Sequence, residues 1–543
     1  MTTTSTIANT TVPFVSAQSE LLTRHVQQQP DRIAVGTSDL QTTITYRQLD
    51  TLVRSAMAQL SRMGLRRSNT VALLSDNSVD FVLGLLAIMF SGARVAPLNP
   101  ALTSNELSTR LSQLSATGLL VTGHLANKPG FANSLPASLS YWIMDLEGSG
   151  SSAEVRIVDK QGRTPAPAAT TDPNILIEGD DIALLMFTGG TTGLPKLVPL
   201  THHNIVASIE NISSGYALSP SDATLLVMPL FHGHGLIGGL LSTLASGGSA
   251  YVPSTGAFSA HLFWPDVVRL GVTWYTAVPT IHRILLNRAS HEYPKSSPVP
   301  LRFIRSCSAP LDEELAAATT ATFGAPMISA YGMTETSHQL SSTPLPVNGI
   351  NTSSVGLATG LDIRIVDESG RDVPSGGLGE IWVRGARVTP GYLDNPEANS
   401  VSFVDGWFRS GDLGNKDEDG YIFVRGRLKE MINHGGEKIS PPDIDVALLS
   451  HPKVLDAASF GEADTIYGEN VEAAVILRPG MQATETELQD YCRTRLSAFE
   501  VPQRIHIVAN FPRTAKGSTD RHALALQFAA SESTVSGSRR TRA

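Results

Sequence analysis

Cysteine is scarce in this chain: only Cys307 and Cys492 occur in 543 residues. Two cysteines so far apart provide neither a disulfide framework nor the paired spacing of a zinc site, and they favour a reducing compartment. Positive charge is also in short supply, since the formal net charge is −9 at pH 7 and the only strongly basic run, Ser538 to Arg542, lies at the C-terminus. This balance argues against a nucleic-acid partner.

Long hydrophobic runs are missing as well. The longest candidate, Phe81 to Phe90, is shorter than the ~18 apolar residues of a membrane span, so we expect a buried helix there and no membrane span. The segment Met1 to Pro13 is rich in threonine and lacks the charged and apolar regions of a signal peptide. We therefore expect a cytoplasmic location.

The composition is that of a loop-rich globular protein, with 41% hydrophobic residues, 17% charged residues, 46 glycines and 32 prolines. Because single hydrophobic cores stop growing at ~250–300 residues, a chain of this length is expected to form at least two domains. We place a large N-terminal domain at residues 1–427, a small mobile domain at 428–530 and a disordered tail at 531–543.

Helical and apolar strand-like segments alternate in the N-terminal part. The helical patterns Tyr46–Met63 and Val79–Phe90 alternate with strands such as Thr70–Leu74 and Ile182–Phe187. This order predicts an α/β fold of parallel sheets covered by helices. The Ser- and Pro-rich stretch Gly148–Pro173 is expected to be a surface excursion.

The sequence pattern changes after Gly360, where short strand-like segments separated by glycines predict a β subdomain. From Glu430 onward a separate βα alternation predicts the small α+β domain, with a helix at Pro442–Ser450.

A Gly- and Thr-rich loop follows the strand Ile182–Phe187. Its glycines free backbone N–H groups to surround an anion, while threonine hydroxyls and a lysine add donors, which is typical of a triphosphate site. A Walker A loop would need Gly-Lys-Ser/Thr at the start of a helix, and here Pro195 precedes Lys196. The loop reads Thr188-Gly189-Gly190-Thr191-Thr192-Gly193-Leu194-Pro195-Lys196.

This loop resembles the phosphate loop of the acyl-adenylate-forming superfamily, which contains acyl-CoA synthetases, luciferases and peptide-synthetase adenylation domains. Further superfamily motifs follow in order: Tyr331-Gly332-Met333-Thr334-Glu335, Gly406-Trp407-Phe408-Arg409-Ser410-Gly411-Asp412, Arg425-Gly426-Arg427-Leu428-Lys429-Glu430 and Gly435-Gly436-Glu437-Lys438. The resemblance covers roughly residues 20 to 525 and implies ATP, Mg²⁺ and CoA as cofactor and co-substrates.

The resemblance also implies roles for single residues. The ring of Tyr331 stacks near adenine, Thr334 contacts the α-phosphate, and Glu335 holds Mg²⁺, a hard cation that prefers oxygen ligands. Asp412 accepts hydrogen bonds from the ribose, while Arg427 and Lys196 face the phosphates. Lys429 is the pivot of the small domain, and Gly435 and Gly436 line the CoA tunnel.

Within the superfamily the chain is most similar to oxalyl-CoA synthetases, through Phe231-His232-Gly233-His234-Gly235-Leu236, Ser306-Cys307-Ser308-Ala309-Pro310-Leu311 and Glu335-Thr336-Ser337-His338. A small dicarboxylate needs donors for its second carboxylate, and His338 with Ser306 or Ser308 would provide them. Two histidines at i and i+2, His232 and His234, make a poor zinc site. The resemblance instead implies that His232 forms a wall of the acid tunnel.

One motif departs from the superfamily pattern. Where the family has a catalytic lysine near the C-terminus this chain has Ser518, and Lys516 lies two positions earlier, on the same face of an extended segment. We expect Lys516 to replace the missing lysine. The acceptor stays open between CoA and an amine, and a degenerate nucleotide-binding protein is a third possibility.

Overall fold

The computed structural model describes residues 23–128, 131–132, 135–136, 139–148, 150–164, 177–188, 195–294, 299–347, 353–513 and 519–528. A seven-stranded sheet occupies the N-terminal part of the molecule. Its inner strands are parallel, and antiparallel strands close both edges. The strand order is β7 (Glu154–Asp159), β6 (Ser140–Glu147), β5 (Gly118–Thr122), β3 (Thr70–Leu74), β4 (Arg94–Leu98), β8 (Ile182–Phe187) and β9 (Leu197–Thr201).

A nine-stranded sheet forms the centre of the molecule. Its inner strands are parallel, and β2, β15 and β16 add antiparallel edges. The order is β16 (Leu357–Ala358), β15 (His338–Ser342), β14 (Met327–Met333), β13 (Phe303–Ser306), β12 (Trp274–Ala277), β10 (Ala223–Leu225), β11 (Ser249–Val252), β1 (Ile33–Thr37) and β2 (Thr43–Thr45).

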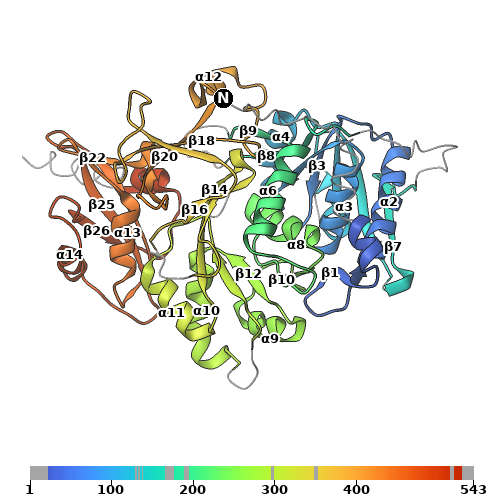
Figure 1. Ribbon diagram of the computed structural model, residues 1–543, viewed down its shortest axis with the longest axis horizontal. Helices are drawn as coiled ribbons and strands as arrows, with labels where there is room; N and C mark the ends of the chain where they lie inside the picture. Colours follow the sequence, from blue (N-terminus) through green and yellow to red (C-terminus); the bar gives the residue numbers. More distant parts are fainter. Residues whose placement is uncertain are drawn as a thin grey trace, which may run out of the picture.

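Helices lie between and around these two sheets (Figure 1). Helix α3 (Val79–Phe90) contacts strands of both sheets, which explains why it is apolar on every side and buried along its length. Helix α6 (His202–Gly215) likewise contacts β8 and β9 of one sheet and β15 of the other. Other helical segments up to residue 330 include α2 (Tyr46–Arg62), α4 (Ser104–Gln113), α5 (Gly123–Ala126), η2 (Gly150–Ser152), α7 (Gly233–Gly235), η3 (Leu236–Leu241), α8 (Ser242–Ala245), α9 (Ala260–Leu270), α10 (Pro279–Glu292) and α11 (Glu313–Phe323).

Two smaller sheets complete the fold. The first is antiparallel and contains β17 (Asp362–Val366), β18 (Gly379–Arg384), β20 (Trp407–Lys416), β19 (Phe403–Val404) and β21 (Ile422–Arg427), with η4 (Thr334–Thr336) before it and α12 (Pro396–Ser402) in a connection. The second follows η5 (Leu428–Glu430) and contains β23 (Glu437–Ile439), β22 (Ile432–His434), β25 (Gly468–Leu477), β24 (Val454–Asp464) and β26 (Arg504–Ile507), with helices α13 (Pro441–Leu449) and α14 (Glu485–Arg493).

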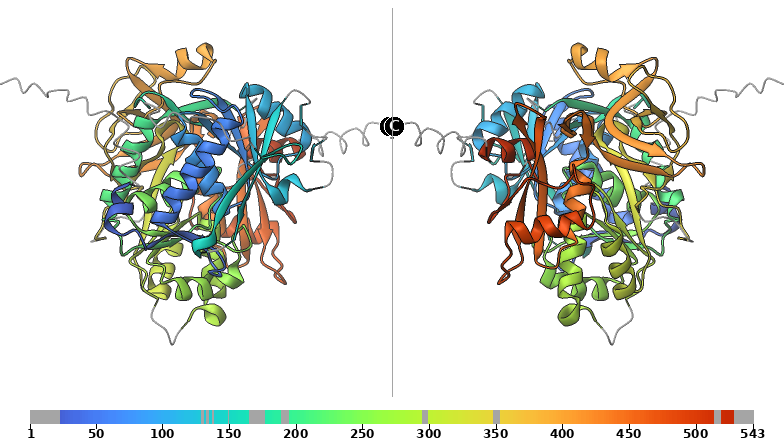
Figure 2. Two further views of the ribbon diagram at one scale, coloured as in Figure 1. Left: turned by 90° about the vertical axis from the view of Figure 1, so that its right-hand side faces the viewer. Right: turned by 90° about the vertical axis from the view of Figure 1, so that its left-hand side faces the viewer.

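The C-terminal sheet lies at one end of the molecule, and the views in Figure 2 show it as a layer of its own. The predicted boundary at 427/428 falls between β21 and β22, and the predicted tail 531–543 lies outside the described residues.

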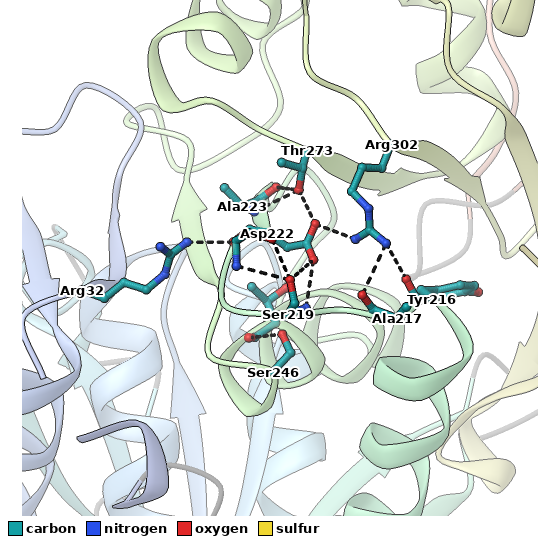
Figure 3. A network of polar contacts seen from close by, with 11 residues as sticks. Arg32, Tyr216, Ala217, Ser219, Asp222, Ala223, Ser246, Thr273 and Arg302 are labelled. Atoms are coloured by element: carbon teal, nitrogen blue, oxygen red, sulfur yellow. Dashed lines mark hydrogen bonds and ion pairs between the residues drawn. The ribbon is translucent and has the colours of Figure 1, made fainter. Parts of the chain in front are cut away.

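A buried ion-pair network ties together the starts of three neighbouring parallel strands (Figure 3). Asp222, which is fully buried, precedes β10; its carboxylate accepts hydrogen bonds from Thr273 Oγ1, just before β12, and from Arg302 Nη1, just before β13, both at 2.7 Å. The backbone N–H of Ser219 donates to the same carboxylate at 2.9 Å. Because these donors satisfy the charge, the buried carboxylate holds the three strand ends in register.

The predicted α/β architecture is confirmed, and most predicted elements agree with the structure within two residues. The stretch Gly148–Pro173 differs, because its residues Glu154–Asp159 form β7 and pair along β6. The apolar residues Val155, Ile157 and Val158 indicate a strand, but the Ser- and Pro-rich residues on either side led to the prediction of a surface excursion. Among the helices that the structure describes, none is long and apolar enough to cross a membrane.

Candidate active site

Hydrogen bonds join the two ends of the predicted phosphate loop. Thr188, at the end of β8, donates its backbone N–H to the carbonyl of Lys196 at 2.9 Å, and its hydroxyl accepts the Lys196 N–H at 3.1 Å. This pairing brings the two ends of the loop together. The loop residues between them, Gly189, Gly190, Thr191, Thr192 and Gly193, lie outside the described residues.

Lys196, Tyr392 and Glu335 form a chain of contacts beside the loop. The ammonium of Lys196 lies 4.2 Å from the centre of the Tyr392 ring, and the Tyr392 hydroxyl donates to Glu335 Oε1 at 2.9 Å. The carbonyl of Glu335 accepts the backbone N–H of Thr389 at 2.8 Å. One tyrosine therefore contacts both the cation expected to bind phosphate and the carboxylate expected to hold Mg²⁺.

The charges of this cluster depend on one another. Burial lowers the pKa of Lys196, the Glu335 carboxylate opposes that effect, and the nearby cation of Lys429 adds to it. Burial raises the pKa of Tyr392, and the adjacent Glu335 carboxylate raises it further. The hydroxyl of Tyr392 therefore stays protonated and acts as a donor.

Glu335 is suited to hold a magnesium ion together with a nucleotide. No group of three or more His, Cys, Asp or Glu side chains that could hold a metal occurs within the described part of the chain. Mg²⁺ in nucleotide enzymes commonly uses one or two carboxylates, water and the substrate's own phosphates. A single glutamate beside a phosphate loop fits that pattern.

A second group surrounds Asp412 in β20. Asp412 is 3% exposed; its carboxylate accepts a hydrogen bond from the hydroxyl of Tyr331 and pairs with Arg427 Nε at 3.1 Å. Burial raises the pKa of Asp412, while Arg427 and the Tyr331 hydroxyl pull it back. The predicted ribose ligand and the predicted phosphate cation thus lie side by side. Thr334 directly precedes Glu335 in η4.

The hinge residues connect the two ends of the molecule. Lys429 lies in η5, two residues after Arg427. The next residue, Glu430, has its Oε2 atom 3.7 Å from Nε of Arg521 in the C-terminal part. Gly435 and Gly436 form an exposed turn between β22 and β23, in which the Gly435 N–H donates to the Tyr467 carbonyl at 2.7 Å. The described contacts of this turn do not include Glu335 or Lys196. The predicted catalytic Lys516 lies outside the described residues.

Two of the residues predicted for the acid, His338 and Ser308, belong to a polar cluster around the buried Arg305 in β13. Arg305 Nη2 and His338 Nε2 are 2.9 Å apart, and the rings of His338 and His234 stack with centroids 5.3 Å apart. His234 contacts Ser308 Oγ at 3.0 Å and Thr276 Oγ1 at 2.6 Å. We call these five residues, His234, Thr276, Arg305, Ser308 and His338, the acid cluster.

The backbone makes room for His338. A Cβ atom at Gly238 would lie 2.5 Å from His338 Nε2, and one at Gly332 would lie 1.4 Å from the His338 carbonyl oxygen, so both positions require glycine. His338 itself has φ of +88°, and Ser337 before it has φ of +52°. Such conformations persist in non-glycine residues where the surroundings impose them, and they gather at functional sites.

Two predicted acid-binding residues lie apart from this arrangement. The Ser306 hydroxyl is buried and has no hydrogen-bond partner among the described residues, whereas Ser308 reaches His234. The ring of His232 packs against Phe231 at 4.5 Å, and it is His234 that joins the acid cluster. The Nε2 atom of His232 is also buried, and the role of His232 as a wall of the acid tunnel stays a prediction.

The acid cluster carries one fixed positive charge. Burial lowers the pKa of both His234 and His338 well below the usual value, and the charge of Arg305 lowers both further, so both rings are neutral at pH 7. Arg305 keeps its charge because a guanidinium is protonated at every physiological pH. The sequence interpretation missed Arg305 and Tyr392; the only available signal for Arg305 was a charged residue inside the apolar strand Phe303–Ser306.

Comparisons with known proteins agree with this geometry. The profile of the family described as "AMP-binding enzyme" matches residues 22–393, and that of the "AMP-binding enzyme C-terminal domain" matches residues 443–518. An oxalate–CoA ligase of Arabidopsis thaliana is 42% identical over 94% of this chain and 98% of its own. Its counterpart in Saccharomyces cerevisiae is 36% identical over 92% and 95%, and a sulfoacetate–CoA ligase of Cupriavidus necator is 34% identical over 92% and 96%.

Solved structures show the same fold. ATP-bound MatB from Rhodopseudomonas palustris superposes with a TM-score of 0.81 at 26% identity, over 94% of this chain and 99% of its own. o-Succinylbenzoate CoA synthetase from Bacillus subtilis, solved with ATP and a magnesium ion, superposes with a TM-score of 0.78 at 27% identity, over 92% and 98%.

Proposed function

The chain belongs to the AMP-binding enzyme family and is an acid–thiol ligase that works through an acyl-adenylate, and we propose that its acid is a small dicarboxylate and its acceptor is CoA. The named relatives support this, because oxalate and sulfoacetate are both small acids with a second anionic group. ATP and Mg²⁺ complete the proposed set of substrates and cofactor.

One observation carries the proposal for the acid. Arg305 is 0% exposed and donates to the neutral side chains of Tyr216, Thr276, His338 and Gln339, each 2.9 Å away. Within the described residues it forms no ion pair with a carboxylate. A buried cation without a counter-charge is costly, and a second carboxylate of the substrate would supply that counter-charge.

The first half-reaction joins two anions. The carboxylate that reacts is already ionised at pH 7, so its oxygen attacks the α-phosphorus without a general base, and pyrophosphate leaves as the P–O bond breaks. Lys196, Arg427 and the loop amides reduce the repulsion between the anions and stabilise the transition state. When bound at Glu335, Mg²⁺ neutralises phosphate charge.

The remaining predicted residues position the nucleotide. Asp412 would accept hydrogen bonds from the ribose hydroxyls, the ring of Tyr331 would lie near adenine, and the Thr334 hydroxyl would contact the α-phosphate. The ion pair between Asp412 and Arg427 links the residue proposed to bind the ribose to the residue proposed to face the phosphates. Lys516 is proposed to bridge the acid and the α-phosphate in this step.

In the second half-reaction the CoA thiolate attacks the acyl carbon and AMP leaves. We assign the change between the steps to rotation of residues 428–530 about Lys429 relative to residues 1–427, which would bring Gly435 and Gly436 to the site. In the structure this turn is exposed. Its neighbour Lys438 pairs with the exposed Glu368 at 2.9 Å, and because surface ion pairs contribute little, the rotation would break this contact at low cost.

The test separates acid from acceptor. ATP–pyrophosphate exchange is measured with oxalate, malonate and succinate, each beside the monocarboxylate of equal length, and CoA is then added and thioester is identified by mass spectrometry. We expect exchange with a short diacid and the matching thioester. Exchange only with monoacids would overturn the dicarboxylate proposal. Amide products without thioester would overturn the acceptor, and ATP binding without exchange would indicate a protein that has lost catalysis.

A further inference from the structure

A second buried arginine is connected to the acid cluster by a short chain of polar contacts. Arg387, between β18 and α12, is 0% exposed. Its Nε and Nη1 atoms have no hydrogen-bond partner among the described residues, and its Nη2 donates only to Thr359 Oγ1, at 3.4 Å. Buried polar atoms are almost always satisfied, so two orphaned guanidinium nitrogens on one side chain require an explanation.

The backbone, and not the side chain, holds Arg387 in place. Its carbonyl accepts the Ser337 hydroxyl at 2.9 Å, and the carbonyl of Ala386 before it accepts from Asn204 at 2.7 Å. The same short segment continues to Thr389, which binds the Glu335 carbonyl. The charge of Arg387 is therefore fixed beside the active site by contacts that its own guanidinium does not make.

Arg387 has no carboxylate partner within the described ranges. Burial lowers its pKa to about 10, which leaves the guanidinium charged at pH 7. An unpaired buried charge destabilises a fold, so its presence without compensation is the pattern of a group kept for function.

A chain of contacts connects this charge to the acid cluster. Thr359 Oγ1 is 3.4 Å from Gln339 Nε2, and Gln339 Oε1 accepts from Arg305 Nη2 at 2.9 Å. Arg305 in turn contacts His338, and the charge of Arg387 also acts on the His338 ring. Two guanidinium groups thus share one polar network that contains no acidic side chain.

We propose that Arg387 is a positioning residue that gives the acid cluster its second buried positive charge, and that this charge selects acids bearing a second anionic group. The inference rests on the proposed function, since it concerns the same acid site. Arg387 acts through Thr359, Gln339 and Arg305, and it raises the electrostatic potential where the second carboxylate binds. A monocarboxylate, which brings no second charge to this end of the site, gains little from it.

The proposal is tested with Arg387→Met, which removes the charge at similar volume, and with Arg387→Lys, which keeps it. For each variant kcat/KM in ATP–pyrophosphate exchange is measured with the preferred diacid and with its matched monoacid, and the free energy of unfolding is measured in urea without ligands. The methionine variant is expected to lose about tenfold or more with the diacid, to keep its rate with the monoacid, and to be at least as stable as the parent protein. The lysine variant is expected to retain most of the preference.

Three results would overturn the proposal: equal losses with both acids, an unchanged preference, or a methionine variant that is less stable or fails to fold. The last result would assign Arg387 a structural role. The parent protein is measured first, and if it shows no preference for diacids, the proposed function fails before any variant is compared. A parent preference that survives in Arg387→Met would leave the proposed function intact and reject only this inference.

Discussion

Tyr392 offers the sharpest test of how the active site is organised, because its two contacts can be removed one at a time. Its ring lies beneath Lys196 at 4.2 Å, and its hydroxyl donates to Glu335 at 2.9 Å. Tyr392→Phe removes only the hydroxyl. Tyr392→Leu removes the ring as well, and with it the cation–π contact.

The magnitudes follow from the two contacts. A hydrogen bond to a charged group contributes ~1.5–3 kcal/mol, so Tyr392→Phe should lower the adenylation rate roughly 10- to 150-fold if that bond orients Glu335 in the transition state. A cation–π contact contributes ~0.5–2 kcal/mol, so Tyr392→Leu should lose a further 2- to 30-fold. The leucine variant should also require more ATP, because Lys196 loses the surface that orients it.

The assay is ATP–pyrophosphate exchange over a series of free Mg²⁺ concentrations. We expect Tyr392→Phe to need more Mg²⁺ for half-maximal rate, because a carboxylate that is free to turn presents its oxygens less often in the ligating direction. Tyr293→Phe is the matched control: the Tyr293 hydroxyl donates to the Phe323 carbonyl at 3.1 Å in a separate hydrophobic cluster. A Tyr392→Phe variant with the parent rate and the parent Mg²⁺ dependence would refute the reasoning.

Three further predictions concern stability and the altered motif. Asp222→Asn removes the charged acceptor of Arg302, whose side chain is 38% exposed, and we expect about 1.5–3 kcal/mol less free energy of unfolding, read from urea titrations at pH 7. Burial lowers the pKa of His282 to about 4, below the 6.5 of the unfolded chain, so the unfolded state takes up the proton first and stability should fall as the pH drops from 6.5 to 4, by about 3 kcal/mol for this residue. His282→Gln, which cannot titrate, should show a shallower decline, and a parallel decline would contradict the assignment. Lys516→Ala should slow adenylation ~10²-fold while the transfer from preformed acyl-AMP to CoA continues, and an unchanged exchange rate would show that Lys516 does not replace the missing lysine.

The sequence alone predicted the features that depend on short runs of consecutive residues. The segments that contain Lys196, Glu335, Asp412 and Arg427 each carry a local motif, and the structure brings these four side chains into two adjoining groups. The α/β alternation was equally local, because apolar strands and helices buried on every side have distinct lengths and flanks. The family and the fold class predicted from these segments are both confirmed.

The rest depended on long-range contacts that no local pattern encodes. Tyr392 is one tyrosine in a loop, and its importance appears only when β14 brings Glu335 to it across the sheet edge. His234 contacts Ser308, Thr276 and the His338 ring, and no local pattern distinguishes it in advance from His232. Arg305 and Arg387 stand out by burial without a counter-charge, a property that exists only in the folded chain.

The acid cluster is concentrated on one sheet, whereas the nucleotide residues come from several. Four residues of the acid cluster lie on or just after strands of the nine-stranded sheet. The nucleotide residues come from three sheets: Tyr331 lies on β14, Lys196 just before β9, and Asp412 and Arg427 on β20 and β21. The acid specificity can therefore change through substitution of a few side chains on one rigid sheet, while the residues that act on ATP stay the same. Arg387 is the exception, because the segment from Arg387 to Tyr392 also contacts Glu335, through the Thr389 N–H and the Tyr392 hydroxyl. A lineage or a designer that changes the acid through Arg387 must do so without disturbing the magnesium carboxylate two contacts away.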